Sequence, residues 1–209
     1  MKSRKIVISA MLIALATVLS LLQPFQLPFG GGITIASMMP VVILSYMFGV
    51  RWGLFSAFVY SILQIALGIR TVSAFFMPGD EAMALGNAIC VCLLDYIVAY
   101  TVLGFGGIFK GKFKNESISI ILGAVLATTL RYITHIVSGA IFFGAWAEWF
   151  FTQDGFYSVG ALIMDTFSGV GLSVMYSIFY NGLYMIPEII ITAVCAPFVY
   201  KILKKSNDI

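Results

Sequence analysis

Hydrophobic residues form six long runs in this chain, and polar residues gather in the short segments between them. A run of about 20 mainly apolar residues is long enough to cross the hydrocarbon core of a bilayer as an α-helix. The pattern therefore predicts an all-α integral membrane protein with a single six-helix domain over residues 1–209. The transmembrane helices are expected at residues 6–23, 33–50, 52–69, 83–108, 117–143 and 172–202.

Lysine and arginine residues are distributed very unevenly between the two sides of the predicted bundle. Ten of the 12 basic residues fall on the side that holds the N-terminus. The opposite side has only Arg70, and Arg131 lies within the fifth predicted span. Because basic residues concentrate in cytoplasmic loops, we expect both termini in the cytoplasm, which agrees with an even number of spans. The expected location is the cell membrane.

The composition supports the membrane prediction and excludes other classes. Hydrophobic residues make up 61% of the chain and charged residues only 10%, whereas a soluble domain carries roughly 25% charged residues. A soluble enzyme, a secreted disulfide scaffold and a nucleic-acid-binding protein are therefore excluded, and the surrounding solvent is membrane lipid. With one histidine and three cysteines set in hydrophobic segments, we expect no metal site and no cofactor.

Few ionisable residues lie within the predicted spans, and these residues are candidates for function because burying them in a membrane is costly. They are Asp95, Arg131, His135 and Glu188. Arg131 and His135 are four residues apart, so they share one face of a helix. The direction of each span places Asp95, His135 and Asn181 at similar depth in the outer half. We therefore expect a binding pocket that opens to the outside.

Aromatic residues are expected around this pocket and indicate what it binds. They are Tyr96, Tyr132, Phe143, Trp146 and Tyr176. Aromatic faces stack on heterocycles and attract cations. The pocket would therefore suit a flat, cationic or nitrogen-rich ring, with Asp95 near the charge and with His135 and Asn181 fixing ring nitrogens or a hydroxyl. The alternative for Asp95 is a structural pair with Arg131, and for Glu188 structural pairing is the favoured interpretation.

Two further segments leave alternatives open. The connection over residues 144–171 is rich in aromatic residues and would form a lid, a short surface helix or an aromatic belt at the lipid boundary. In the first span, Ala10 and Ala14 lie four residues apart, and small residues at this spacing let another helix approach closely. A partner-docking role and a chance occurrence in an alanine-rich helix fit Ala10 and Ala14 about equally well.

The residues do not favour an enzyme. The segment over residues 106–112 has the spacing of a phosphate-binding loop, but Phe113 stands where serine or threonine must bind magnesium. The chain is therefore not expected to hydrolyse ATP. A small intramembrane enzyme that acts on lipid remains an alternative, although the single histidine and the lone pocket carboxylate count against it. A purely structural membrane subunit is a third possibility.

Several short motifs resemble a known family. They are Gly31-Gly32-Ile33-Thr34 through Met39-Pro40, Arg51-Trp52-Gly53-Leu54, Leu93-Leu94-Asp95-Tyr96, Gly104-Phe105-Gly106-Gly107, Arg131-Tyr132-Ile133-Thr134-His135 through Gly144, and Tyr176-Ser177-Ile178-Phe179-Tyr180-Asn181-Gly182 with Pro187-Glu188. Through these motifs the chain resembles the substrate-binding S components of energy-coupling factor (ECF) vitamin transporters, and most closely the thiamine-specific family. The resemblance covers nearly the whole length.

The resemblance implies both a fold and a function. Proteins of this kind are six-helix membrane subunits that capture a vitamin from outside and have no ATPase of their own. A transmembrane coupling subunit and two cytoplasmic ATPases drive uptake, and the first helix, here with Ala10 and Ala14, docks on the coupling subunit. The function expected is that of a thiamine-binding S component. An S component for another flat vitamin or for a thiamine precursor is the alternative within this class.

The resemblance also implies roles for individual pocket residues. Asp95 and Tyr96 occupy the place that contacts the thiazolium side of thiamine. His135, Tyr176 and Asn181 fall on positions that bind the ring systems and the hydroxyl tail. A tryptophan position of the family corresponds to Phe143 here, and Trp146 follows three residues later.

Overall fold

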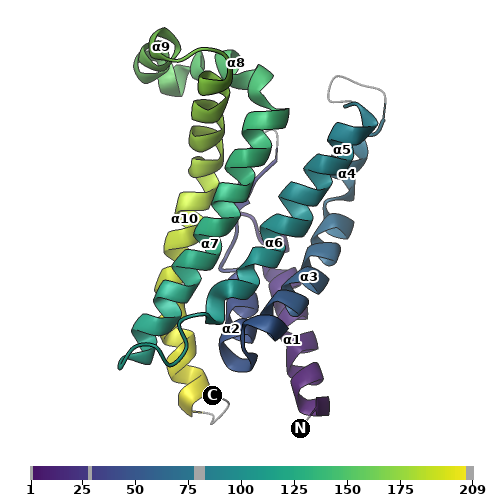
Figure 1. Ribbon diagram of the computed structural model, residues 1–209, viewed down its shortest axis with the longest axis vertical. Coiled ribbons are helices and arrows are strands. Elements are labelled where there is room, and N and C mark those ends of the chain that lie inside the picture. Colours follow the sequence, from purple (N-terminus) through teal and green to yellow (C-terminus); the bar gives the residue numbers. More distant parts are fainter. Residues whose placement is uncertain (1, 28–29, 78–82, 206–209) are drawn as a thin grey trace.

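The described chain is almost entirely helical, and its long helices run along a common direction (Figure 1). The computed structural model describes residues 2–27, 30–77 and 83–205. In chain order the elements are α1 (Lys2–Leu21), β1 (Phe25–Gln26), β2 (Gly32–Ile33), α2 (Met39–Phe48), α3 (Val50–Leu67), α4 (Ile69–Ala74), α5 (Leu85–Val91), η1 (Cys92–Val98), α6 (Ala99–Thr101), η2 (Val102–Gly107), α7 (Glu116–Phe142), η3 (Gly144–Trp146), α8 (Ala147–Phe151), η4 (Asp154–Phe156), α9 (Tyr157–Thr166) and α10 (Gly169–Lys205).

Five helical stretches within the described residues are long and apolar enough to cross a membrane. They are Ser3–Leu21, Val50–Leu67, Leu85–Gly107, Glu116–Phe142 and Gly169–Ile202. These stretches correspond to the first and the third to sixth spans predicted from the hydrophobic pattern. Each has large apolar side chains that remain exposed, such as Met11, Phe55 and Ile141 at 66%, 58% and 63%. Lipid would cover these side chains in a membrane.

The second predicted span, residues 33–50, is much shorter in the structure than the sequence suggested. Only Met39–Phe48 is helical, and ten residues rise about 15 Å. The preceding residues form strand β2, which pairs with β1 in an antiparallel hairpin, and a turn in which Ala36 has a φ of 56°. Pro40 lies in the first turn of α2, where its missing N–H costs no hydrogen bond.

Helix α2 is enclosed by protein on all sides. It packs against α1, α3, η2 and α7, and eight of its ten residues are buried. A helix buried all round has no polar face. The continuous apolar run over residues 39–48 therefore reflects the interior of the protein and not a lipid-facing helix.

Two columns of helices stand side by side in the bundle. Helices α7 and α10 pack along each other and form the first column. Helix α3 packs against η1, α6 and η2, and together these elements form the second column (Figure 1). The connection predicted over residues 144–171 folds mainly into α8 and α9, at the end of the molecule away from both termini (Figure 1). Phe150 and Phe151 of α8 are buried against aromatic residues of α10. This connection is therefore a pair of short helices anchored by an aromatic cluster.

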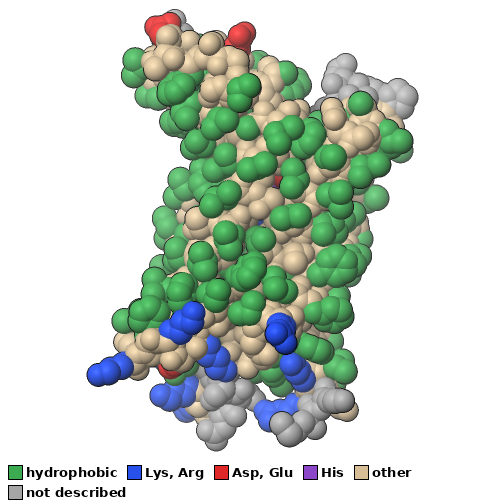
Figure 2. Space-filling view, in the orientation of Figure 1, with side chains coloured by type: hydrophobic (Ala, Val, Ile, Leu, Met, Phe, Trp, Pro, Cys, Tyr) green, Lys and Arg blue, Asp and Glu red, His purple; other side chains and the backbone are tan. Residues whose placement is uncertain are grey.

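Basic side chains gather at one end of the long axis. Figure 2 shows blue lysine and arginine side chains gathered at the end where both termini lie, and acidic side chains at the opposite end near α9. Apolar side chains cover most of the face between them. This is the distribution that the count of basic residues along the sequence predicted.

The column from α5 to η2 changes its winding along its length. Seven residues, Cys92–Val98, form the π-helix η1, and a 3-10 helix, Val102–Gly107, ends the column. π-Helical turns are rare and occur often at functional sites. Glycines let the 3-10 end of the column approach its neighbours: a Cβ on Gly123 of α7 would lie 1.9 Å from the backbone oxygen of Gly106. Here two backbones are in direct contact.

Candidate binding site

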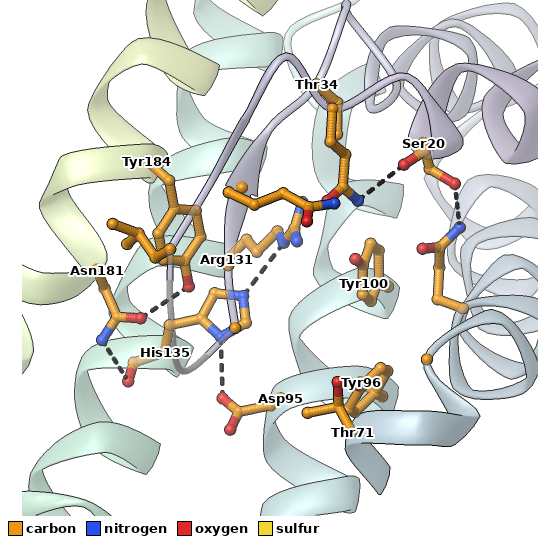
Figure 3. Close-up of a pocket in the computed structure, with 18 of the residues that line it drawn as sticks. Ser20, Thr34, Thr71, Asp95, Tyr96, Tyr100, Arg131, His135, Asn181 and Tyr184 are labelled. Atoms are coloured by element: carbon orange, nitrogen blue, oxygen red, sulfur yellow. Dashed lines mark hydrogen bonds and ion pairs between the residues drawn. The ribbon is translucent and has the colours of Figure 1, made fainter.

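A cavity of about 630 Å³ lies within the bundle. Its wall comes from the end of α1, the β1–β2 hairpin, α3, α4, η1, α7 and α10. It extends from the buried Glu188 to the exposed Arg70. The volume falls in the range typical of small-molecule sites. Figure 3 shows polar side chains from three helices converging on this space.

Asp95 is held on the cavity wall by two hydrogen bonds from α7. Its Oδ1 lies 2.9 Å from Nδ1 of His135, and Ser138 Oγ donates to its Oδ2 at 2.8 Å. The π-helix η1 carries Asp95 and its neighbour Tyr96, and both residues line the cavity. The Asp95 side chain is 21% exposed. Asp95 therefore keeps access to the cavity while its orientation is fixed.

Arg131 determines the protonation of His135. The Nε–H of Arg131 donates to Nε2 of His135 at 3.3 Å, and arginine has no acceptor, so Nε2 must carry the lone pair. The proton of the neutral ring is then on Nδ1, from which it is donated to Asp95 (Figure 3). Asp95 and Arg131 are thus linked through His135 instead of in the direct pair that was one interpretation of the sequence.

Arg131 itself is buried beside an aromatic ring. Its guanidinium carbon lies 4.1 Å from the ring centroid of Tyr100, a cation–π contact. A second guanidinium nitrogen lies 3.0 Å from the sulfur of Met38. These contacts fix a positive charge between the outer and the inner parts of the cavity.

The amide of Asn181 is already hydrogen-bonded within the protein. Its Nδ2 donates to the backbone oxygen of Ser177 at 2.9 Å and to that of His135 at 3.3 Å, and its Oδ1 accepts from the hydroxyl of Tyr184 at 2.7 Å. Asn181 lines the cavity, and in this arrangement it joins α10 to α7. A ligand would use the second lone pair of Oδ1 or displace one of these bonds.

Glu188 is a buried carboxylate on the cavity wall. Its Oε1 accepts from the backbone N–H and the hydroxyl of Thr34, at 2.5 Å and 2.6 Å, so that α10 is tied to the segment after the hairpin. The residue is 2% exposed, and its Oε2 has no hydrogen-bond partner among the described residues. The pairing predicted for Glu188 is therefore present, with Thr34 as its partner, but it uses only one carboxylate oxygen.

Aromatic rings line the outer part of the cavity. Phe75 and Phe143 pack against each other at a tilt with ring centroids 6.1 Å apart, and Tyr176 and Tyr180 form a second tilted pair at 5.6 Å. Such walls suit a flat ring. Tyr96 adds a further ring from η1.

Six of the eight residues expected at the pocket line the cavity, whereas Tyr132 and Trp146 do not. Those that line it are Asp95, Tyr96, His135, Phe143, Tyr176 and Asn181. Trp146 lies beyond the end of α7, is 36% exposed and packs edge-on against Trp149. Ala10 and Ala14 are exposed on α1, outside the cavity.

The sequence reasoning missed several residues of the wall. Thr34, Gln64, Tyr100, Tyr180 and Tyr184 all line the cavity. Two of them carried a usable signal, because Tyr180 and Tyr184 lie four and eight residues after Tyr176 and so share its helix face. Thr34 and Gln64 carried none, because an uncharged polar residue within an apolar run has no distinguishing pattern.

The fold and the cavity together define a multi-pass helical membrane protein that binds a small, flat molecule. Comparison with known proteins gives the family. Residues 6–159 match the thiamine transporter protein family, and the chain belongs to this family. The resemblance inferred from the sequence motifs is thereby confirmed, and thiamine is the molecule that the family assignment gives as the substrate.

Two individual proteins are similar to this chain. The thiamine transporter ThiT of Bacillus subtilis is 27% identical over 196 residues, covering 88% of this chain and 84% of that protein. A solved structure of ThiT from Listeria monocytogenes superposes with a TM-score of 0.65 at 19% identity, covering 98% of this chain and 97% of that one. At this identity the second comparison shows a shared fold.

Proposed function

We propose that the protein captures thiamine from outside the cell as the S component of an ECF importer. One observation carries the proposal. The carboxylate of Asp95 faces a largely buried cavity and is held by a neutral histidine and a serine, with no counter-ion among the described residues. A carboxylate in such surroundings is stabilised by a cation. Thiamine supplies a permanent positive charge on its thiazolium ring.

The remaining predicted residues receive roles in the same proposal. Tyr96, Phe143 and Tyr176 stack on the two rings of thiamine, and His135 keeps Asp95 in position by donating from Nδ1. Asn181 accepts from the hydroxyl tail through Oδ1. Trp146 lies outside the cavity wall and contributes at its outer edge, where its fluorescence would respond to a bound ligand.

The direct test is to titrate the purified protein with thiamine and to measure binding by calorimetry and by tryptophan fluorescence. We expect saturable binding of one thiamine per chain, because Asp95, His135 and Asn181 all line the same cavity. Binding of a related heterocycle in place of thiamine would keep the class and change the specificity. A protein that binds neither would return the intramembrane enzyme and the structural subunit to consideration.

We further propose the orientation and the membrane topology of an S component. The second predicted span, which completes the set of six, is then α2 with the segment before it. It crosses the membrane surrounded by protein and not in contact with lipid. Both termini lie in the cytoplasm of a cell whose plasma membrane holds the protein. The gathering of basic side chains at the end with the termini supports this orientation (Figure 2).

The exposed face of α1 is proposed as the docking surface for the transmembrane coupling subunit, which in turn binds two cytoplasmic ATPases. Ala10 and Ala14 leave a shallow strip on this helix, flanked by the exposed side chains of Val7 and Met11. Small residues allow a partner helix to approach closely. The strip lies on the side of α1 that faces away from the cavity and the core.

Replacing Ala10 and Ala14 together by tryptophan should abolish thiamine uptake and leave thiamine binding by the isolated protein unchanged. The bulky rings would fill the strip where a partner helix approaches, at a distance from the cavity. Uptake of labelled thiamine by cells and calorimetry on the purified variant measure the two effects. Leu15→Trp is the matched control, because Leu15 is 47% exposed and points about 100° away from Ala14 on the helix. Normal uptake by the double variant would count against docking through this strip.

A further inference from the structure

The inner end of the cavity contains a carboxylate oxygen that nothing in the described protein satisfies. Glu188 lines the cavity and is 2% exposed, and its Oε2 has no hydrogen-bond partner. A buried acceptor of this kind costs free energy unless a donor reaches it. The other oxygen, Oε1, accepts two hydrogen bonds from Thr34, so the orientation of the carboxylate is fixed.

The depth of Glu188 separates it from Asp95. Asn181 lies level with His135, because its amide reaches the backbone oxygen of that residue. Glu188 follows Asn181 by seven residues in α10, which corresponds to about 10 Å along the helix axis toward the end that holds the termini. The cavity therefore offers two carboxylates at two depths, and Arg131 lies between them.

The charges at the two depths are not equivalent. Arg131 precedes His135 by one turn of α7, so its positive charge lies on the Glu188 side of Asp95, whereas the neighbours that bind Asp95 are neutral. A cationic ring is therefore favoured beside Asp95 and disfavoured beside Glu188, where the positive charge of Arg131 would repel it. The free Oε2 instead suits a neutral N–H donor.

We propose that Glu188 is a second ligand-binding residue, whose Oε2 accepts a hydrogen bond from the ring amino group of thiamine. This inference rests on the function proposed above and adds the direction in which the ligand lies. The amino-substituted pyrimidine ring enters first and reaches the inner end at Glu188. The thiazolium ring and its hydroxyl tail remain in the outer part, beside Asp95.

The test compares two ligands and three proteins by calorimetry. The ligands are thiamine and its analogue in which a carbonyl oxygen replaces the ring amino group. The proteins are the wild type, Glu188→Gln and Thr34→Val. Glutamine keeps an oxygen that can accept from Thr34 but presents an amide N–H₂ in place of Oε2, so it separates the structural bond from the ligand bond.

We expect the wild type to prefer thiamine over the carbonyl analogue by at least about tenfold. The carbonyl oxygen of the analogue cannot donate a hydrogen bond to Oε2 of Glu188, which is itself an acceptor. Glu188→Gln should weaken thiamine binding by about 10- to 100-fold and remove or reverse this preference, since the amide can donate to the carbonyl. Thr34→Val should retain the preference, because it removes the hydroxyl's bonds to Oε1 and to Ser37, keeps the backbone N–H bond to Oε1 and leaves Oε2 in place. The thermal midpoint of each variant in detergent verifies that it is folded.

Several results would overturn the inference. Equal affinity of the wild type for the two ligands would do so without any variant, even where Glu188→Gln fails to fold. So would thiamine binding by Glu188→Gln within about twofold of the wild type, as expected if a buried water or a proton satisfies Oε2. An equal loss for both ligands would assign Glu188 a structural role only. Failure of the wild type to bind thiamine at all would instead overturn the proposed function and this inference together.

Discussion

Thiamine binding is expected to weaken by about 100-fold when Asp95 is replaced by asparagine, because removing one member of a buried charge pair costs roughly 2–5 kcal/mol and each 1.4 kcal/mol is a factor of ten. The substitution preserves the shape of the site. The amide oxygen can accept from His135 Nδ1, and the amide nitrogen can donate to the Ser138 hydroxyl, which now accepts. The lost affinity would thus report the charge of Asp95.

The dissociation constant of the Asp95→Asn variant is best measured for thiamine and for a neutral analogue that has an uncharged ring in place of thiazolium. The wild type should prefer the cation strongly, and the variant should show little preference. Asp165→Asn is the control, because Asp165 lies exposed in α9 outside the cavity. If Asp95→Asn retains the full preference for the cation, the thiazolium ring is not recognised by Asp95.

Stability should fall most on replacing Gly123 by alanine, by about 2–3 kcal/mol, as overpacking in a well-packed interior does. The new Cβ would lie 1.9 Å from the backbone oxygen of Gly106. A flexible side chain could move aside at small cost, but a backbone oxygen can move only if η2 separates from α7. Helix α7 carries Arg131 and His135, so a displacement of this contact would also disturb the cavity.

A thermal unfolding scan in detergent tests this expectation, and the midpoint should fall by roughly 5–10 °C. Gly86→Ala serves as the matched control. Gly86 lies in α5, and a Cβ at that position would meet nothing within 4 Å. If the two substitutions shift the midpoint equally, helix propensity accounts for the change and the backbone contact does not.

The long helices were predictable from the sequence because their apolar runs are long and their ends carry charge. Helix α2 was not, since hydropathy records only that residues 33–50 are apolar. It cannot distinguish a helix surrounded by lipid from one surrounded by protein. The hairpin before α2 depends on pairing between Phe25 and Ile33, and a two-residue strand leaves no alternating pattern to detect.

The binding site was predictable where a single residue is costly to bury in a membrane. A charged residue within a span is conspicuous, so Asp95, Arg131 and His135 were all identified as candidates, and the structure brings them together. The partner of Glu188 was not identifiable, because Thr34 lies 154 positions away and is one of many uncharged polar residues. Trp146 was placed by its proximity in sequence to Phe143, but α7 ends at Phe142 and the chain then turns away from the cavity.

The π-helix η1 affects how this chain aligns with its relatives. A π-helical turn holds one residue more than the α-helical turn it replaces. A relative whose fourth span is uninterrupted α-helix would reach the same depth with one residue fewer, and a faithful alignment would open a single gap between Cys92 and Val98. Without that gap, every residue of this span on one side of Asp95 would be aligned one position away from its structural equivalent in the relative. The residue number at which an acidic side chain enters the cavity is therefore a property of helix winding as well as of sequence.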